Sequence, residues 1–164
     1  MKKTITTICI ILPIFFFDRL TKIYLINLQE AGINVDFYIN PFLNFYLIWN
    51  TGIGFGIASS EANIFYHVLT GIIVIVNIVL LFLHIKSKGA YTFLFPIIIG
   101  GSLGNLYDRI NFYAVPDFID LHIGNFHWFI FNVADIFITV GIIGLLVTEL
   151  FNKKNIKKYF IFSF

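Results

Sequence analysis

Four stretches of this 164-residue chain are apolar over almost the length that a helix needs to cross a membrane. They cover about residues 4–25, 64–84, 90–107 and 129–151. A helix requires roughly 20 apolar residues to span the hydrocarbon core. Apolar residue types make up 59% of the chain, and a soluble domain of this size has too little interior to bury them. The sequence therefore predicts one integral membrane domain over residues 1–164, all-α, with four transmembrane helices.

Composition excludes several other classes of protein. The apolar content excludes intrinsic disorder, and the single cysteine excludes a disulfide scaffold. A net charge of +2 gives no indication of nucleic-acid binding. The sequence shows no metal-protease motif and no glycine-rich phosphate loop, and His122 and His127 are expected in a loop. We therefore expect neither a metal nor a cofactor.

The positive charges orient the predicted helices. Eight of the eleven Lys and Arg residues form three clusters, at residues 2–3, 86–88 and 153–158. With four crossings these clusters lie on one side, which the positive-inside rule assigns to the cytoplasm. Both termini are then cytoplasmic, and residues 27–63 and 108–128 lie outside. Part of the first outer segment alternates loosely, so we expect a small β-like or irregular segment between the first two helices.

The first apolar stretch is similar to a secretory signal sequence, since Lys2 and Lys3 precede it. No small-residue cleavage site follows. Asp18 and Lys22 follow instead, spaced so that they share one helix face. We expect an uncleaved first helix, whose Asp18–Lys22 pair either anchors the helix end or takes part in a site.

The third stretch contains G-x-S-x-G around Ser102. This pattern is typical of serine hydrolases only on a strand–turn–helix elbow with a histidine partner. In an apolar helix it indicates close packing of small residues. A serine peptidase that uses His122 or His127 stays open as an alternative.

Two carboxylates stand out because an ionised carboxylate among apolar residues is costly unless it is paired. Asp135 lies a few residues into the fourth stretch, and Asp117 lies in the outer segment before it. One hypothesis has Asp135 protonated or paired with Arg109. The other places Asp135 against Asp117, where two close carboxylates share a proton and act as general base and general acid on a water. Asp108 is expected to pair with Arg109, which can also present donors to a substrate carbonyl.

The chain resembles the lipoprotein signal peptidase family, the bacterial signal peptidase II enzymes. Five blocks carry the resemblance, in this order: DRLTK (18–22), NTGIGF (50–55), GGSLGNLYDR (100–109), VPDFI (115–119) and FNVAD (131–135). Two departures stand out. Pro116 replaces a usual aliphatic residue, and Gly54 stands where alanine is more usual.

The resemblance implies an aspartyl endopeptidase of the bacterial inner membrane, with its active site near the outer face. Such an enzyme removes the signal peptide of a diacylglyceryl-modified prolipoprotein, cutting before the lipidated cysteine, and is inhibited by globomycin. We expect a monomer in contact with membrane lipid. The resemblance places catalysis on Asp117 and Asp135. The other motif residues divide into substrate binding (Asn50, Gly52, Asn105, Arg109, Asn132) and structural support (Asp18, Lys22, Asp108, Ala134).

Two non-peptidase hypotheses remain open. In a structural membrane protein, Asp135 and Arg109 would form a buried pair. In a proton-coupled transporter, the intramembrane Asp135 would carry the proton. A further expectation is that residues 27–63 close over the substrate as a lid.

Overall fold

The computed structural model describes residues 2–52 and 60–161, and the side chains of these residues except 60–63, 65 and 153–161. The helices are α1 (Lys2–Glu30), α2 (Ser60–Lys86), α3 (Tyr91–Phe112) and α4 (Val133–Ile161). The strands are β1 (Asp36–Asn40), β2 (Leu43–Asn50), β3 (Val115–Ile123) and β4 (Phe126–Phe131). Residues 53–56, the glycine-rich part of the expected lid, lie outside the described part of the chain.

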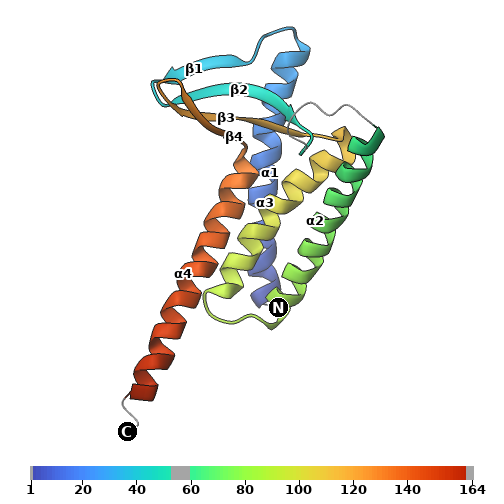
Figure 1. Ribbon diagram of the computed structural model, residues 1–164. Helices are drawn as coiled ribbons and strands as arrows, with labels where there is room; N and C mark the ends of the chain where they lie inside the picture. Colours follow the sequence, from blue (N-terminus) through green and yellow to red (C-terminus); the bar gives the residue numbers. More distant parts are fainter. Residues whose placement is uncertain (1, 53–59, 162–164) are drawn as a thin grey trace.

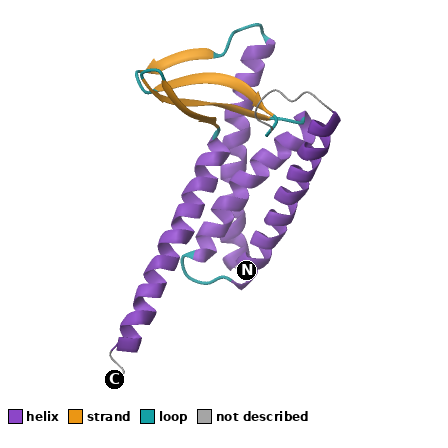
Figure 2. Cartoon of the chain, in the orientation of Figure 1, coloured by secondary structure: helices purple, strands orange, loops and turns teal. Residues whose placement is uncertain are grey.

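The four helices run side by side, and the sheet lies across one end of them (Figures 1 and 2). Helix α3 contacts each of the other three helices. Its small residues permit this close approach: a Cβ atom on Gly104 would lie 2.6 Å from the Oδ2 atom of Asp18. The small-residue packing expected of the third stretch is therefore confirmed.

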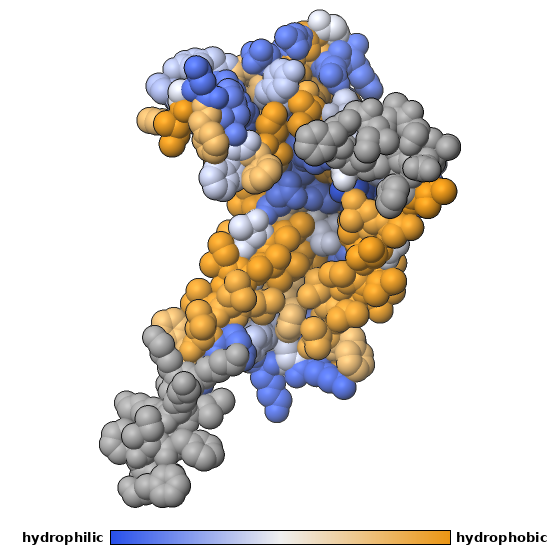
Figure 3. Space-filling model, viewed as in Figure 1, coloured by the Kyte–Doolittle hydropathy of each residue, from blue (hydrophilic) through white to orange (hydrophobic). Residues whose placement is uncertain are grey.

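The outer surface of the helices is apolar, and hydrophilic residues gather near the sheet and at the opposite end (Figure 3). Within the described residues, Tyr66–Lys86 and Val133–Asn152 are long and apolar enough to cross a membrane. Helices α1 and α3 do not meet the same test of length and hydropathy within that part of the chain. A mostly helical protein with exposed apolar helices is confirmed, and the number of crossings stays a prediction.

The sheet is larger than the sequence analysis predicts. Its four antiparallel strands are ordered β1-β2-β3-β4, so both outer segments contribute two strands each. The prediction of β-like structure only between the first two helices is therefore incomplete. The expected loop position of His122 and His127 is wrong, because the two residues face each other across β3 and β4.

Apolar side chains fix the sheet onto the helices. Leu25 of α1, Leu47 of β2, Phe118 of β3 and Val133 of α4 belong to one buried cluster with Val35. Burying such side chains contributes roughly 1.5–3 kcal/mol each. The cluster holds β3 against the start of α4, which brings Asp117 and Asp135 to the same end of the bundle.

All four helices have bounds that differ from the predicted ranges, and α1 and α4 are two examples. Helix α1 continues to Glu30. Residues 129–131 of the fourth apolar stretch belong to β4, and α4 begins only at Val133. An apolar run does not itself distinguish a strand from a helix, which explains the second error.

Candidate active site

Asp117 is the third residue of β3 and is 3% exposed. Its two carboxylate oxygens accept hydrogen bonds from the side-chain amides of Asn50, at 2.8 Å, and Asn132, at 2.5 Å. Burial raises the pKa of Asp117 to about 6, and the neighbouring Asp135 charge raises it further, while both amide hydrogen bonds oppose the rise. Asp117 is therefore a carboxyl group that can gain or lose a proton near neutral pH.

Asp135 lies in the first turn of α4. The Asn132 side chain accepts a hydrogen bond from the backbone N–H of Asp135, and the Asp135 carboxylate accepts one from the backbone N–H of Asn132, both at 3.1 Å. This reciprocal arrangement is a capping box with Asn and Asp in place of the usual Ser and Glu. It explains why the FNVAD block both starts a helix and fixes a carboxylate at the helix N-terminus.

Asn132 joins the two carboxylates. The residue is fully buried, its amide group donates to Asp117, and its backbone donates to Asp135. One residue thus fixes both acids at the junction of sheet and helices. The structure brings together the two residues that the sequence analysis selects for catalysis.

Four charged side chains form a buried cluster beside this pair. Lys22 is fully buried and lies 2.9 Å from Asp18 and 2.8 Å from Asp108. Arg19 forms an ion pair with each of the same two acids. Two positive and two negative charges balance, as buried charges require. Arg19 belongs to this cluster, but it is not among the site residues that the sequence analysis selects. Its position between Asp18 and Lys22 was the available signal.

The charged cluster is connected to Asp135 by two routes. Asn105 accepts a hydrogen bond from Lys22 and donates one to the Asp135 carboxylate, at 2.8 and 2.7 Å. The buried backbone N–H of Ala134 donates to Asp18 at 3.0 Å. The cluster therefore contacts the start of α4 through Asp18 and reaches Asp135 through Lys22 and Asn105. The supporting role of Asp18, Lys22, Asp108 and Ala134 stays a prediction.

Arg109 and Gly52 lie close together at the edge of the site. Gly52 has φ +76°, which favours glycine, and its N–H donates to Asn50 at 2.7 Å. A Cβ atom at Gly52 would lie 3.3 Å from an Arg109 Nη atom. The Nε and Nη1 atoms of Arg109 are buried and have no hydrogen-bond partner among the described residues.

A cavity of about 430 Å³ opens beside Asp135. Apart from Asp135 and Thr139, its lining is apolar or aromatic: Leu121, Trp128, Phe129, Phe131, Ile136 and Val140. The cavity suits a ligand whose apolar segment contacts the aromatic lining and whose polar group lies near the Asp135 carboxylate.

Three of the expected alternatives disagree with these contacts. Ser102 lies within α3 and its hydroxyl accepts a hydrogen bond from Asn77 at 2.7 Å, so the G-x-S-x-G pattern is not a nucleophile elbow. In the described part of the chain, Asp108 pairs with Arg19 and Lys22 and not with Arg109. Likewise, the described partners of Asp135 are Asn105 and Asn132, so its expected pairing with Arg109 is wrong.

The chain is similar to known proteins over nearly its whole length. A family model described as "Signal peptidase (SPase) II" matches residues 10–151. The lipoprotein signal peptidase of Pelagibacter ubique (strain HTCC1062) is 48% identical over 160 residues, covering 96% of each chain. The lipoprotein signal peptidase of Anaplasma phagocytophilum (strain HZ) is 39% identical, covering 92% of this chain and 95% of its own.

Solved structures agree with the sequence matches. A structure described as a bacterial membrane enzyme at 2.3 Å resolution superposes with a TM-score of 0.73 at 30% identity, covering 92% of this chain and 90% of its own. A second, at 1.9 Å resolution, gives 0.72 at 33% identity, covering 88% and 92%. The chain therefore belongs to the signal peptidase II family and is a membrane protease.

Proposed function

We propose that this protein removes the signal peptide from diacylglyceryl-modified prolipoproteins, cutting before the lipidated cysteine, with Asp117 and Asp135 as the catalytic pair. The observation that carries the proposal is Asn132, which hydrogen-bonds to both carboxylates. Family membership favours a peptidase over the structural and transporter hypotheses.

The chemistry follows from the two carboxylates. One ionised carboxylate takes a proton from a water molecule while the water attacks the scissile carbonyl. The other carboxyl, protonated, donates its proton to the developing oxyanion. The first carboxyl then passes the proton it took from water to the leaving amine as the carbon–nitrogen bond breaks, and the second takes back a proton from the diol, so the pair again shares one proton. The raised pKa of Asp117 supports a shared proton at neutral pH. This reaction uses neither a metal nor a covalent intermediate.

The surroundings of the pair support a lipid-bearing peptide as substrate. The apolar cavity beside Asp135 provides a surface for acyl chains or for the apolar signal helix. The guanidinium group of Arg109 lies beside Gly52 and can donate hydrogen bonds to a peptide carbonyl. The carboxylates and the bound peptide are then held in position by the remaining polar residues of the site: Asn50, Gly52, Asn105 and Asn132.

We further propose four membrane crossings in one inner-membrane domain, with both termini in the cytoplasm. At 1.5 Å per residue, the 22 residues of α3 span about 33 Å, enough for the hydrocarbon core. The start of α1 and the end of α4 lie at the same end of the bundle, away from the sheet (Figure 1). Four crossings place the sheet and the carboxylate pair at the outer face.

Cysteine labelling tests this topology. In a chain carrying Cys9→Ser, a Ser87→Cys side chain should react with a membrane-impermeant maleimide only from the cytoplasmic side. An Asp36→Cys side chain should react only from the outside. Reaction of both from one side would contradict the four crossings and leave the cleavage proposal to be tested separately.

The proposed reaction is tested by a gel-shift cleavage assay on a purified, diacylglyceryl-modified prolipoprotein, with chelator present. Wild type and Ser102→Ala should cleave it, whereas Asp135→Asn should not. The unmodified prolipoprotein should be a poor substrate, and a globomycin-type inhibitor should block cleavage. Activity in Asp135→Asn, or its loss in a folded Ser102→Ala, would overturn the proposal.

A further inference from the structure

Three metal-ligating side chains meet on the β3–β4 hairpin, outside the carboxylate pair. Asp120 and His122 are two residues apart on β3, a spacing that places side chains on one face of a strand. His127 of β4 is the cross-strand partner of His122. One ligand atom from each of the three lies within 4.8 Å of the other two.

Both imidazole rings present their Nδ1 atoms to the same carboxylate. The Oδ2 atom of Asp120 lies 2.9 Å from Nδ1 of His127 and 3.7 Å from Nδ1 of His122. The two rings are stacked, with centroids 5.0 Å apart. The three donor atoms therefore converge on one small volume.

His122 supplies the observation that points to a ligand. Its side chain is only 10% exposed, and its buried Nδ1 atom has no hydrogen-bond partner among the described residues. A buried polar atom without a partner is costly. Its backbone N–H donates to the carbonyl of Phe42 at 3.1 Å, which fixes the residue while its ring nitrogen lacks a partner.

The donor set and spacing suit a zinc-class ion. At bond lengths of about 2.0–2.2 Å, donor atoms around a tetrahedral zinc are about 3.4 Å apart. The distances from the Asp120 Oδ2 atom to the Nδ1 atoms of His127, 2.9 Å, and His122, 3.7 Å, lie on either side of this value. Two imidazoles and one carboxylate are typical of zinc and other borderline divalent ions and leave a fourth position for water. His127 is 53% exposed, so its ring is open to solvent and to an incoming ion.

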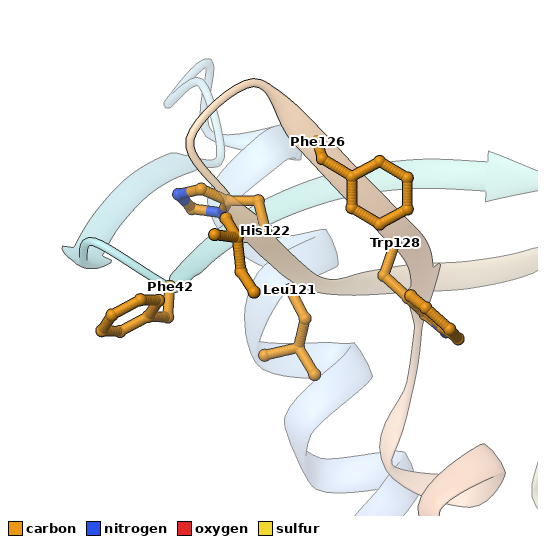
Figure 4. A pocket seen from close by; sticks show the side chains of 6 residues that line it. Phe42, Leu121, His122, Phe126 and Trp128 are labelled. Carbon is orange, nitrogen blue, oxygen red and sulfur yellow. The ribbon is translucent and has the colours of Figure 1, made fainter.

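Apolar side chains lie on one side of this cluster, beside His122. A cavity of about 340 Å³ lies beside His122 and is otherwise lined by Phe42, Leu121, Ile123, Phe126 and Trp128. Figure 4 shows His122 on one strand of the hairpin and Phe126 and Trp128 on the other. An apolar surrounding limits solvent access to bound ions and tunes their properties.

We propose that Asp120, His122 and His127 form a binding site for one Zn²⁺-class divalent ion, which ties β3 to β4. The site does not include Asp117, which lies three residues earlier on β3. The site shares no ligand with the carboxylate pair, so zinc binding and cleavage are measured separately, and failure of one proposal can be distinguished from failure of the other.

The test is titration of the purified full chain, without a histidine tag and in detergent, with ZnCl₂ by isothermal calorimetry. Wild type should bind one ion, and thermal unfolding should shift to higher temperature when zinc is added. His127→Ala and His122→Ala should each weaken binding by about tenfold or more, because each removes one of three ligands. MgCl₂ should not bind, since magnesium prefers oxygen ligands.

The matched control is His67→Ala, which removes an exposed histidine of α2 outside the cluster. It should bind zinc like the wild type. Because His127 is exposed, the His127→Ala variant should unfold, without zinc, at the same temperature as the wild type. A lower unfolding temperature would indicate loss of folding and not loss of a zinc ligand. Absence of zinc binding in wild type, or equal binding in wild type and His127→Ala, would overturn the proposal.

Discussion

Replacing Asp117 by asparagine should make the protein more stable above neutral pH. The folded protein raises the pKa of Asp117 from an ordinary 3.8 to about 6, chiefly because the side chain is buried. The folded state therefore holds the proton more tightly than the unfolded state does. Ionisation of Asp117 then costs stability, which is lost as pH rises from about 4 to about 6.

The magnitude follows from the same two values. At 1.36 kcal/mol per unit, the difference between 3.8 and about 6 corresponds to about 3 kcal/mol. An asparagine is nearly isosteric and stays neutral at every pH. An asparagine side chain has only one oxygen, so its NH₂ group must face the NH₂ group of either Asn50 or Asn132. The free-energy cost of that contact does not change with pH. The stability difference between variant and wild type should therefore grow by about 2–3 kcal/mol between pH 4 and pH 8.

The assay is equilibrium unfolding of both proteins in mixed detergent micelles over this pH range. Asp36→Asn is the control, because Asp36 is exposed on β1, and its curve should parallel that of the wild type. If the ionised Asp117 carboxylate instead stabilises the fold, Asp117→Asn should be less stable than the wild type at pH 8. If the difference between Asp117→Asn and wild type does not change with pH, the reasoning from burial is wrong.

Two further substitutions test the support of the site. Lys22→Met leaves two buried carboxylates with a single cation and should cost about 3–5 kcal/mol. In thermal unfolding the loss should far exceed that of the exposed control Lys88→Met, and equal losses would contradict the buried network. Gly52→Ala should be strained by the positive φ, and its Cβ atom would lie 2.8 Å from Leu69 and 3.3 Å from an Arg109 Nη atom. Both side chains must then shift, and the shift of Arg109 should lower kcat/KM for prolipoprotein cleavage. An unchanged kcat/KM would show that Arg109 does not depend on this close approach.

The sequence predicts the helical part of the fold well because its apolar stretches are long and nearly unbroken. Apolar stretches of about 20 residues have few alternatives in a chain of this composition. The sheet was predicted only in part, because pairing between β2 and β3 joins residues about 70 positions apart. Local alternation does not show such long-range pairing.

The same distinction holds at the candidate site. Asp117 and Asp135 stand out in the sequence because each is a carboxylate among apolar residues. The pairing of Asp108 was predicted wrongly. Two residues adjacent in the sequence, such as Asp108 and Arg109, point their side chains in different directions from a helix. Neighbours at i and i+1 do not face each other, and Asp108 turns inward to Arg19 and Lys22. The meeting of Asp120, His122 and His127 depends on strand pairing and was missed for the same reason as the sheet.

The measurement that tests the central claim most directly is kcat/KM for prolipoprotein cleavage in Asp117→Asn, Asp135→Asn and the double variant. If the two carboxylates act as one unit on one water, each single variant should lose about 10²–10⁴-fold or more. The double variant should then lose no more than the single variants do, because residues that act together are not additive. Losses that multiply in the double variant, or a single variant near wild-type activity, would contradict the paired mechanism.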